Sequence, residues 1–148
     1  MGILATTMLQ AGGEVIGVIP QALMTKEIAH PGVTDMRVVG SMHERKALMA
    51  DLSDAFIGLP GGYGTLEEFF EVVTWAQLGL HRKPCGLLNA AGYYSLLLAQ
   101  LDHLVTEGFL SPVNRSLVLE HSEPDQLLDL VASFRSPMKE EWIEKDET

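Results

Sequence analysis

Short apolar runs alternate with longer helical segments along almost the whole chain. The runs are continuously apolar rather than alternating with a period of two, as in strands buried on both faces. Such strands, separated by helices, form parallel sheets covered on both sides, so we expect a doubly wound α/β fold. Strands are predicted at residues 14–19, 36–39, 55–59, 84–88 and 117–120, and helices at 1–11, 20–28, 41–52, 66–80, 93–107 and 123–134.

Length and composition predict one soluble domain. The chain has 148 residues, of which 47% are apolar and 20% charged, and we expect a domain over residues 1–135 with a charged tail at 136–148. A formal net charge of −10 argues against a nucleic-acid partner. No apolar run approaches the roughly 18 residues that a membrane span needs. The single cysteine, Cys85, fits a reducing compartment, so a cytoplasmic location is expected.

A glycine-rich loop joins the predicted strand 55–59 to the helix 66–80. Its glycines allow the backbone to approach a ligand, and the N–H groups of the following helix favour an anion. We therefore expect a phosphate site, in which Thr65 can cap the helix and also donate its hydroxyl to a phosphate oxygen. The loop has neither the spacing of a dinucleotide fingerprint nor the Gly-Lys-Ser/Thr of a Walker A loop. It reads Pro60, Gly61, Gly62, Tyr63, Gly64, Thr65, Leu66, Glu67 and Glu68.

Two adjacent carboxylates follow the loop and are expected in the first helical turn. Glu67 and Glu68 point about 100° apart on a helix, so they cannot share one role. Favourable pairing with the helix dipole is one explanation. The other explanation is that one of the two carboxylates has a chemical role, and the residues alone leave both explanations open.

A second charged segment precedes the strand 55–59. Ser41 and Glu44 form a capping-box pattern for the helix 41–52, which carries the cations Arg45 and Lys46. For most pairs of adjacent cations, a solvated helix face would be a sufficient explanation. Here the preceding element ends at the same sheet edge as the glycine loop, so Arg45 can hold a phosphate or fix a carboxylate, and Lys46 can add a charge.

The helix 66–80 is apolar almost all round. We favour a homodimer interface on this helix, with a crowded monomer core as the alternative. The histidines show no metal-ligand spacing, and we expect no metal site. They are His30, His43, His81, His103 and His121.

Together, the segments 60–68 and 42–46 resemble the Lonely Guy family of cytokinin riboside 5′-monophosphate phosphoribohydrolases, which are often labelled lysine decarboxylases. The similarity continues through residues 12–20, 74–79 and 86–89, and it covers roughly residues 1–120. It implies a Rossmann-like fold, a cytosolic homodimer or larger assembly, and neither pyridoxal phosphate nor a required metal.

What the resemblance implies chemically is hydrolysis of the N-glycosidic bond of a nucleoside 5′-monophosphate, such as AMP or an N6-substituted AMP. The products are a free base and ribose 5-phosphate. Arg45 and Glu68 then correspond to the catalytic pair. The implied substrate contacts are Glu27, Met42, Arg45, Lys46, Gly61, Gly62, Tyr63, Gly64, Thr65, Leu66, Glu67 and Thr74.

One departure from the family pattern concerns the amino terminus. Members usually begin with a strand, a helix and a second strand that ends in another glycine-rich loop, and Met1-Gly2 resembles the end of that segment. The comparison implies that two N-terminal strands and the second loop are absent here. We therefore expect low stability for the chain alone.

Two other functions compete with hydrolysis. A carrier of a phosphorylated cofactor, like the molybdenum-cofactor carriers, would need the glycine loop but not the pair of Arg45 and Glu68. A pyridoxal-phosphate decarboxylase would need a lysine in a recognisable Schiff-base context, and the sequence has none. The presence of both members of the pair favours the hydrolase.

Overall fold

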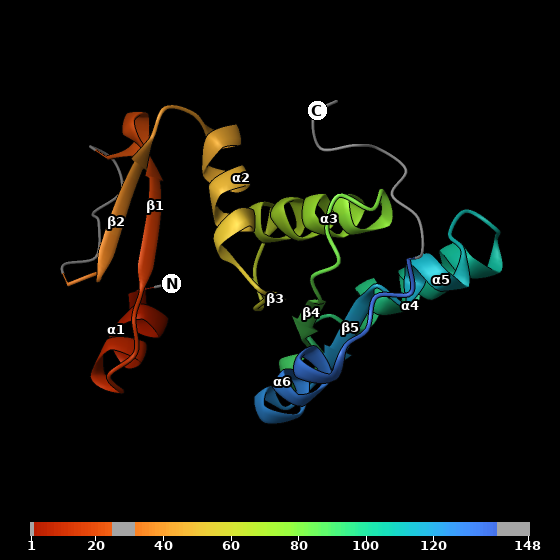
Figure 1. Cartoon of the computed structure of the whole chain (residues 1–148). Coiled ribbons are helices and arrows are strands. Elements are labelled where there is room, and N and C mark those ends of the chain that lie inside the picture. Colours follow the sequence, from red (N-terminus) through yellow and green to blue (C-terminus); the bar gives the residue numbers. More distant parts are fainter. Residues whose placement is uncertain (1, 25–31, 139–148) are drawn as a thin grey trace. The chain divides into compact units, whose positions relative to one another are not determined.

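The computed structural model of the chain describes residues 2–24 and 32–138 (Figure 1). It divides into two compact units, Met1–Ser53 and Asp54–Thr148. Each unit is an α/β arrangement of its own and is described separately.

The first unit contains a two-stranded parallel sheet. Its strands pair in register from Ile16 opposite Asp35 to Pro20 opposite Val39. Gly12, with φ of 80°, follows the end of the helix predicted at residues 1–11, because a left-handed residue after a helix costs glycine little. The elements are α1 (Gly2–Gln10), β1 (Ile16–Pro20), the 3-10 turn η1 (Gln21–Leu23), β2 (Asp35–Val39) and α2 (Met42–Leu52).

The second unit contains a three-stranded parallel sheet in the order β3-β4-β5. Helices connect the strands, as parallel pairing requires. The elements are β3 (Phe56–Gly58), α3 (Tyr63–Gln77), β4 (Cys85–Leu88), the 3-10 turn η2 (Ala90–Gly92), α4 (Ser95–Thr106), α5 (Pro112–Arg115), β5 (Val118–His121) and α6 (Pro124–Ser133).

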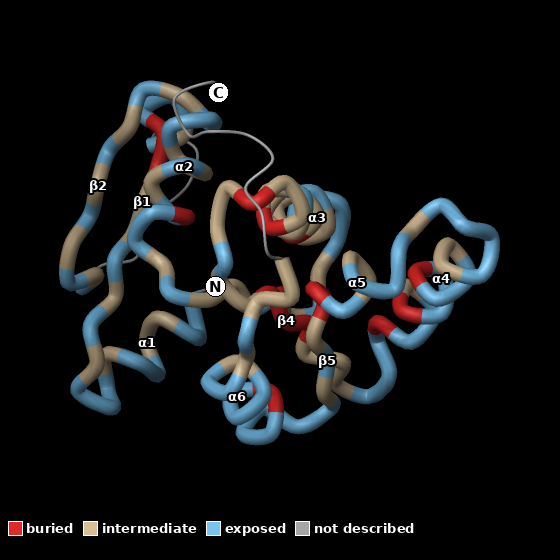
Figure 2. The backbone as a smooth tube through the Cα atoms, turned by 45° about the vertical axis from the view of Figure 1, so that its right-hand side comes forward, coloured by how far each residue is buried: buried red, intermediate tan, exposed pale blue. Residues whose placement is uncertain are grey.

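Helices cover both faces of this second sheet. Cys85 and Leu87 of β4 are in the buried core with Phe69 of α3 and Leu98 of α4. Buried residues, red in Figure 2, gather around β4 and β5. Gly86 faces the opposite way, since a Cβ built there would lie 3.0 Å from Cδ1 of Leu127 in α6. The predicted doubly wound α/β class is confirmed.

The strands lie within two residues of their predicted positions, while the helix boundaries differ more. Helix α3 begins at Tyr63, three residues earlier than predicted. The short helix α5 was not predicted, because four residues carry no periodicity; Ser111 caps it by accepting the N–H of Asn114 at 3.1 Å. The helix predicted at 20–28 is a single 3-10 turn up to residue 23, and its later residues lie outside the described part.

The division of the chain into a domain at 1–135 and a charged tail stays a prediction, and residues 139–148 lie outside the described part. Among residues 2–24 and 32–138, no helix is both long and apolar enough to cross a membrane.

Candidate functional site

The glycine loop lies where the sequence places it, between β3 and α3. Gly62 is the N-cap of α3, and the N–H of Leu66 donates to its carbonyl at 3.1 Å. The first N–H groups of any helix lack partners within the helix. Tyr63, the first helical residue, is 94% exposed. The loop therefore offers backbone donors and a helix dipole at its open end.

The three glycines of this loop have different surroundings. A Cβ on Gly61 would collide with the side chain of Thr65, whose own Cβ would be 2.9 Å away. A Cβ on Gly62 or Gly64 would meet nothing within 4 Å. Gly61 is thus required by packing, whereas Gly62 and Gly64 leave open space for a ligand to approach.

The prediction that Thr65 caps α3 is wrong. Gly62 occupies the cap, no side chain caps it, and Thr65 is the third helical residue. The apolar pattern predicts a helix from residue 66, which would make Thr65 its cap, but α3 begins three residues earlier, at Tyr63.

The placement of Glu67 and Glu68 in the first turn of α3 is also wrong. With the helix starting at Tyr63, they are its fifth and sixth residues, and the first turn contains no acidic residue. Favourable pairing with the helix dipole falls off within the first turn, so it is a weaker explanation for them. Glu67 is exposed and Glu68 is half-buried. Farther along α3, Thr74 donates its hydroxyl to the carbonyl of Phe70 at 2.7 Å.

Two tyrosines that the sequence did not single out contact the glycine loop. The hydroxyl of Tyr93 donates to the carbonyl of Gly61 at 2.9 Å, and that of Tyr94 donates to the carbonyl of Leu59 at 2.5 Å. Burial raises the pKa of Tyr94 above its ordinary value. The available signal was their position just after β4, because neighbouring parallel strands end at the same sheet edge.

In the first unit, the cationic segment opens α2 through the predicted capping box. Ser41 accepts the N–H of Glu44 at 3.1 Å, and the Glu44 carboxylate accepts the N–H of Gly40 at 2.8 Å. This arrangement fixes the first turn, on which Met42 and Arg45 lie. Lys46 follows directly and is half-buried.

Arg45 carries an unsatisfied donor. Its Nε is buried and has no hydrogen-bond partner among the described residues. Leaving such a group unpaired costs about 1–3 kcal/mol, which a ligand or a carboxylate would offset. Arg45 is therefore chemically suited to the role that the sequence comparison implies.

The candidate residues fall into both units. The segment from Gly61 to Glu68 and Thr74 belong to Asp54–Thr148, while Met42, Arg45 and Lys46 belong to Met1–Ser53. Glu27 lies outside the described residues. The pairing of Arg45 with Glu68 stays a prediction.

The only cysteine is isolated from this chemistry. Cys85 is 1% exposed in β4, and burial raises the pKa of its thiol to about 12. A thiol held neutral in this way is a poor nucleophile. Across residues 2–24 and 32–138, no three side chains of His, Cys, Asp or Glu gather where they could hold a metal ion.

Known proteins are similar to this chain over most of its length. Residues 1–131 match the model of a family described as "Possible lysine decarboxylase". A cytokinin riboside 5′-monophosphate phosphoribohydrolase of Rhodococcoides fascians is 52% identical over 138 residues, which are 93% of this chain and 68% of that protein. Two proteins of the same name from Arabidopsis thaliana are 52% and 46% identical to this chain. The two matches cover 90% and 95% of this chain, and 63% and 64% of the respective relatives. The chain thus spans about two thirds of the length of these curated relatives.

Proposed function

Since the chain belongs to the Lonely Guy family, whose model carries the description "Possible lysine decarboxylase", we propose that it hydrolyses the N-glycosidic bond of a nucleoside 5′-monophosphate. The substrate would be AMP or an N6-substituted AMP, and the products a free base and ribose 5-phosphate. The observation that carries this proposal is the glycine loop, which opens α3 with unobstructed backbone at Gly62 and Gly64.

In this proposal the loop from Gly61 to Leu66 holds the 5′-phosphate and thereby fixes the ribose. Lys46 adds a positive charge, which also offsets the repulsion that a chain of net charge −10 exerts on an anion. Holding the phosphate positions the glycosidic bond for attack by water. Glu27, Met42 and Thr74 complete the substrate contacts.

Glu68 is the proposed catalytic carboxylate. Cleavage of an N-glycosidic bond develops positive charge on the ribose ring, which a nearby carboxylate stabilises while it positions the attacking water. Arg45 orients that carboxylate or contacts the phosphate through its guanidinium. Glu67, about 100° around the helix from Glu68, binds a ribose hydroxyl.

The test is to incubate the full chain with AMP and to measure adenine and ribose 5-phosphate by chromatography. Separate Glu67→Gln and Glu68→Gln variants assign the roles, because each keeps the shape of the side chain and removes its charge. We expect Glu68→Gln to lose at least about a hundredfold in kcat, in line with the loss of one stabilising group. Near-normal turnover by Glu68→Gln contradicts the assignment, and AMP binding without release of adenine would favour the carrier.

Assembly and location are part of the same proposal. We place a homodimer interface on α3, where Leu66, Phe70, Val72 and Val73 are only partly buried against the core. The mass of the chain in solution, measured by light scattering, distinguishes a dimer from a monomer. A cytoplasmic location is proposed because the sequence has a single cysteine, Cys85, and therefore no internal disulfide.

A further inference from the structure

Two hydrogen bonds from one short segment hold the backbone of the glycine loop. Tyr93 and Tyr94 follow the turn η2 and donate their hydroxyls to the carbonyls of Gly61 and Leu59. Both acceptors belong to the residues that join β3 to α3. The tyrosines therefore act on the backbone of the loop.

Bonding the carbonyls determines where the loop's N–H groups point. In a trans peptide the C=O and the following N–H lie on opposite sides, and the described backbone is trans throughout. Because the Gly61 carbonyl faces Tyr93, the N–H of Gly62 is turned away from that tyrosine. The Leu59 carbonyl precedes Pro60, which has no N–H, so the bond from Tyr94 fixes the start of the loop without orienting any donor.

The tyrosine segment is itself anchored to the sheet. The side-chain oxygen of Asn89 accepts the N–H of Tyr94 at 2.7 Å, and the N–H of Asn89 donates to the carbonyl of His121 in β5 at 2.9 Å. The rings of Tyr93 and Tyr94 meet edge to face with centroids 5.0 Å apart. A chain of contacts thus runs from β5 through Asn89 to the glycine loop.

We propose that Tyr93 and Tyr94 are positioning residues of the glycine loop: Tyr93 orients the peptide that carries the Gly62 N–H toward the substrate's 5′-phosphate, and Tyr94 fixes the start of the loop. This role rests on the function proposed above. Tyr94 is 2% exposed and fixes the beginning of the loop, whereas Tyr93 is 55% exposed and fixes the peptide that carries the Gly62 N–H. Neither tyrosine is assigned a chemical step, since both act through the loop.

The experiment uses Tyr93→Phe and Tyr94→Phe in the full chain, each of which removes one hydroxyl and keeps the ring. Ser116→Ala is the matched control, because Ser116 likewise donates a hydroxyl to a backbone carbonyl, that of Val113 at 2.7 Å, at the end of α5. The first readout is the set of amide signals of Gly61, Gly62 and Gly64 in chains labelled with ¹⁵N-glycine. The second is KM and kcat for release of adenine from AMP.

We expect Tyr93→Phe to shift the Gly62 amide signal and to raise KM for AMP about tenfold, the scale of one hydrogen bond, with kcat little changed. The phosphate is held in the ground state and the transition state alike, so the loss falls on KM. Ser116→Ala should change neither readout. Since Tyr93→Phe alters an exposed residue, it remains informative if Tyr94→Phe fails to fold.

Unchanged Gly62 signals and unchanged KM in Tyr93→Phe would overturn the positioning role. If the wild-type chain releases no adenine, the proposed function fails, and the glycine signals alone then decide the structural part of the inference. In that case a shifted Gly62 signal supports the orientation by Tyr93, and an unshifted one overturns it.

Discussion

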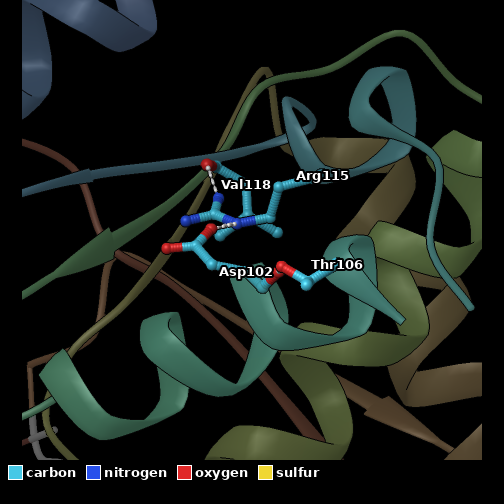
Figure 3. A network of polar contacts seen from close by, with 4 residues as sticks. All are labelled: Asp102, Thr106, Arg115 and Val118. Atoms are coloured by element: carbon cyan, nitrogen blue, oxygen red, sulfur yellow. Dashed lines mark hydrogen bonds and ion pairs between the residues drawn. The ribbon is translucent and has the colours of Figure 1, made fainter. Parts of the chain in front are cut away.

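Arg115 donates from Nε to Oδ1 of Asp102 at 2.7 Å, and this ion pair ties α5 to α4 (Figure 3). The same guanidinium donates from Nη1 to the carbonyl of Val118, the first residue of β5, at 3.2 Å. The Arg115 side chain is 20% exposed and that of Asp102 is 65% exposed. One arginine therefore links three elements, and only one of its partners is mostly in water.

We predict that Arg115→Ala costs more stability than Asp102→Ala. An exposed ion pair contributes at most about 1 kcal/mol, so Asp102→Ala should lose no more than that, and less in 1 M salt. Arg115→Ala also unpairs the Val118 carbonyl and removes a partly buried stem, so about 1–3 kcal/mol is expected. Urea unfolding of both variants measures the difference, and equal losses would mean that the bond to Val118 contributes nothing.

Alanine at two positions of the glycine loop should have opposite effects on stability. Gly61→Ala forces a Cβ against Thr65 and should cost about 1–3 kcal/mol. Gly64 lies within α3 with open space around it, so Gly64→Ala should stabilise the chain by about 0.5–1 kcal/mol. If the phosphate approaches Gly64, that variant should nevertheless bind AMP more weakly. Thermal unfolding and KM for AMP check this, and a stabilised Gly64→Ala variant with unchanged KM would place the phosphate elsewhere.

Two substitutions across the β4–α6 contact should compensate each other. Leu127 is 1% exposed, and Leu127→Ala should cost about 2–5 kcal/mol. Gly86→Ala alone introduces a Cβ 3.0 Å from Cδ1 of Leu127, but Leu127→Ala removes that atom. We expect the double variant to be more stable, by about 0.5–3 kcal/mol, than the sum of the two single losses predicts. The control is Leu128→Ala, at a side chain 52% exposed, which should combine additively with Gly86→Ala.

Stability should fall at alkaline pH partly because of Cys85. Its thiol has a pKa near its ordinary value of 9.0 when unfolded and about 12 when folded. Below pH 9 both states carry the proton, and between pH 9 and 12 only the folded state keeps it. Ionisation therefore favours unfolding by up to about 1.4 kcal/mol per pH unit in that window. Cys85→Ala should lose less stability than the wild type between pH 8.5 and 10.5 in urea titrations, and parallel losses would contradict the prediction.

The elements that the sequence predicts well are those with strong local patterns. The capping box of Ser41 and Glu44 marks the start of α2 correctly, because the contact is made within four residues. The apolar runs locate the five strands of the described residues, and burial on both faces accounts for the continuous pattern best in β4, where Cys85, Gly86 and Leu87 are all buried. Glycines at 12 and 108 end α1 and α4 with φ of 80° and 78°.

What the sequence misses depends on contacts between distant segments. The predicted start of α3 is three residues late, because Tyr63 and Gly64 carry no helical signal. The hydrogen bonds of Tyr93 and Tyr94 span 32 and 35 residues, a separation at which no local pattern operates. Met42, Arg45, Lys46 and the glycine loop were located by motif, while their mutual arrangement stays a prediction.

The capping box also has a consequence for the order in which structure is gained. The turn that carries Arg45 is closed by hydrogen bonds among residues 40–44, so its formation requires no contact with distant parts of the chain. The glycine loop acquires its hydrogen bonds from Tyr93 and Tyr94 only after β4 and η2 are in place. The cationic segment is therefore encoded locally and the loop non-locally. Partial unfolding that frees the tyrosine segment would release the loop while leaving the cationic turn formed.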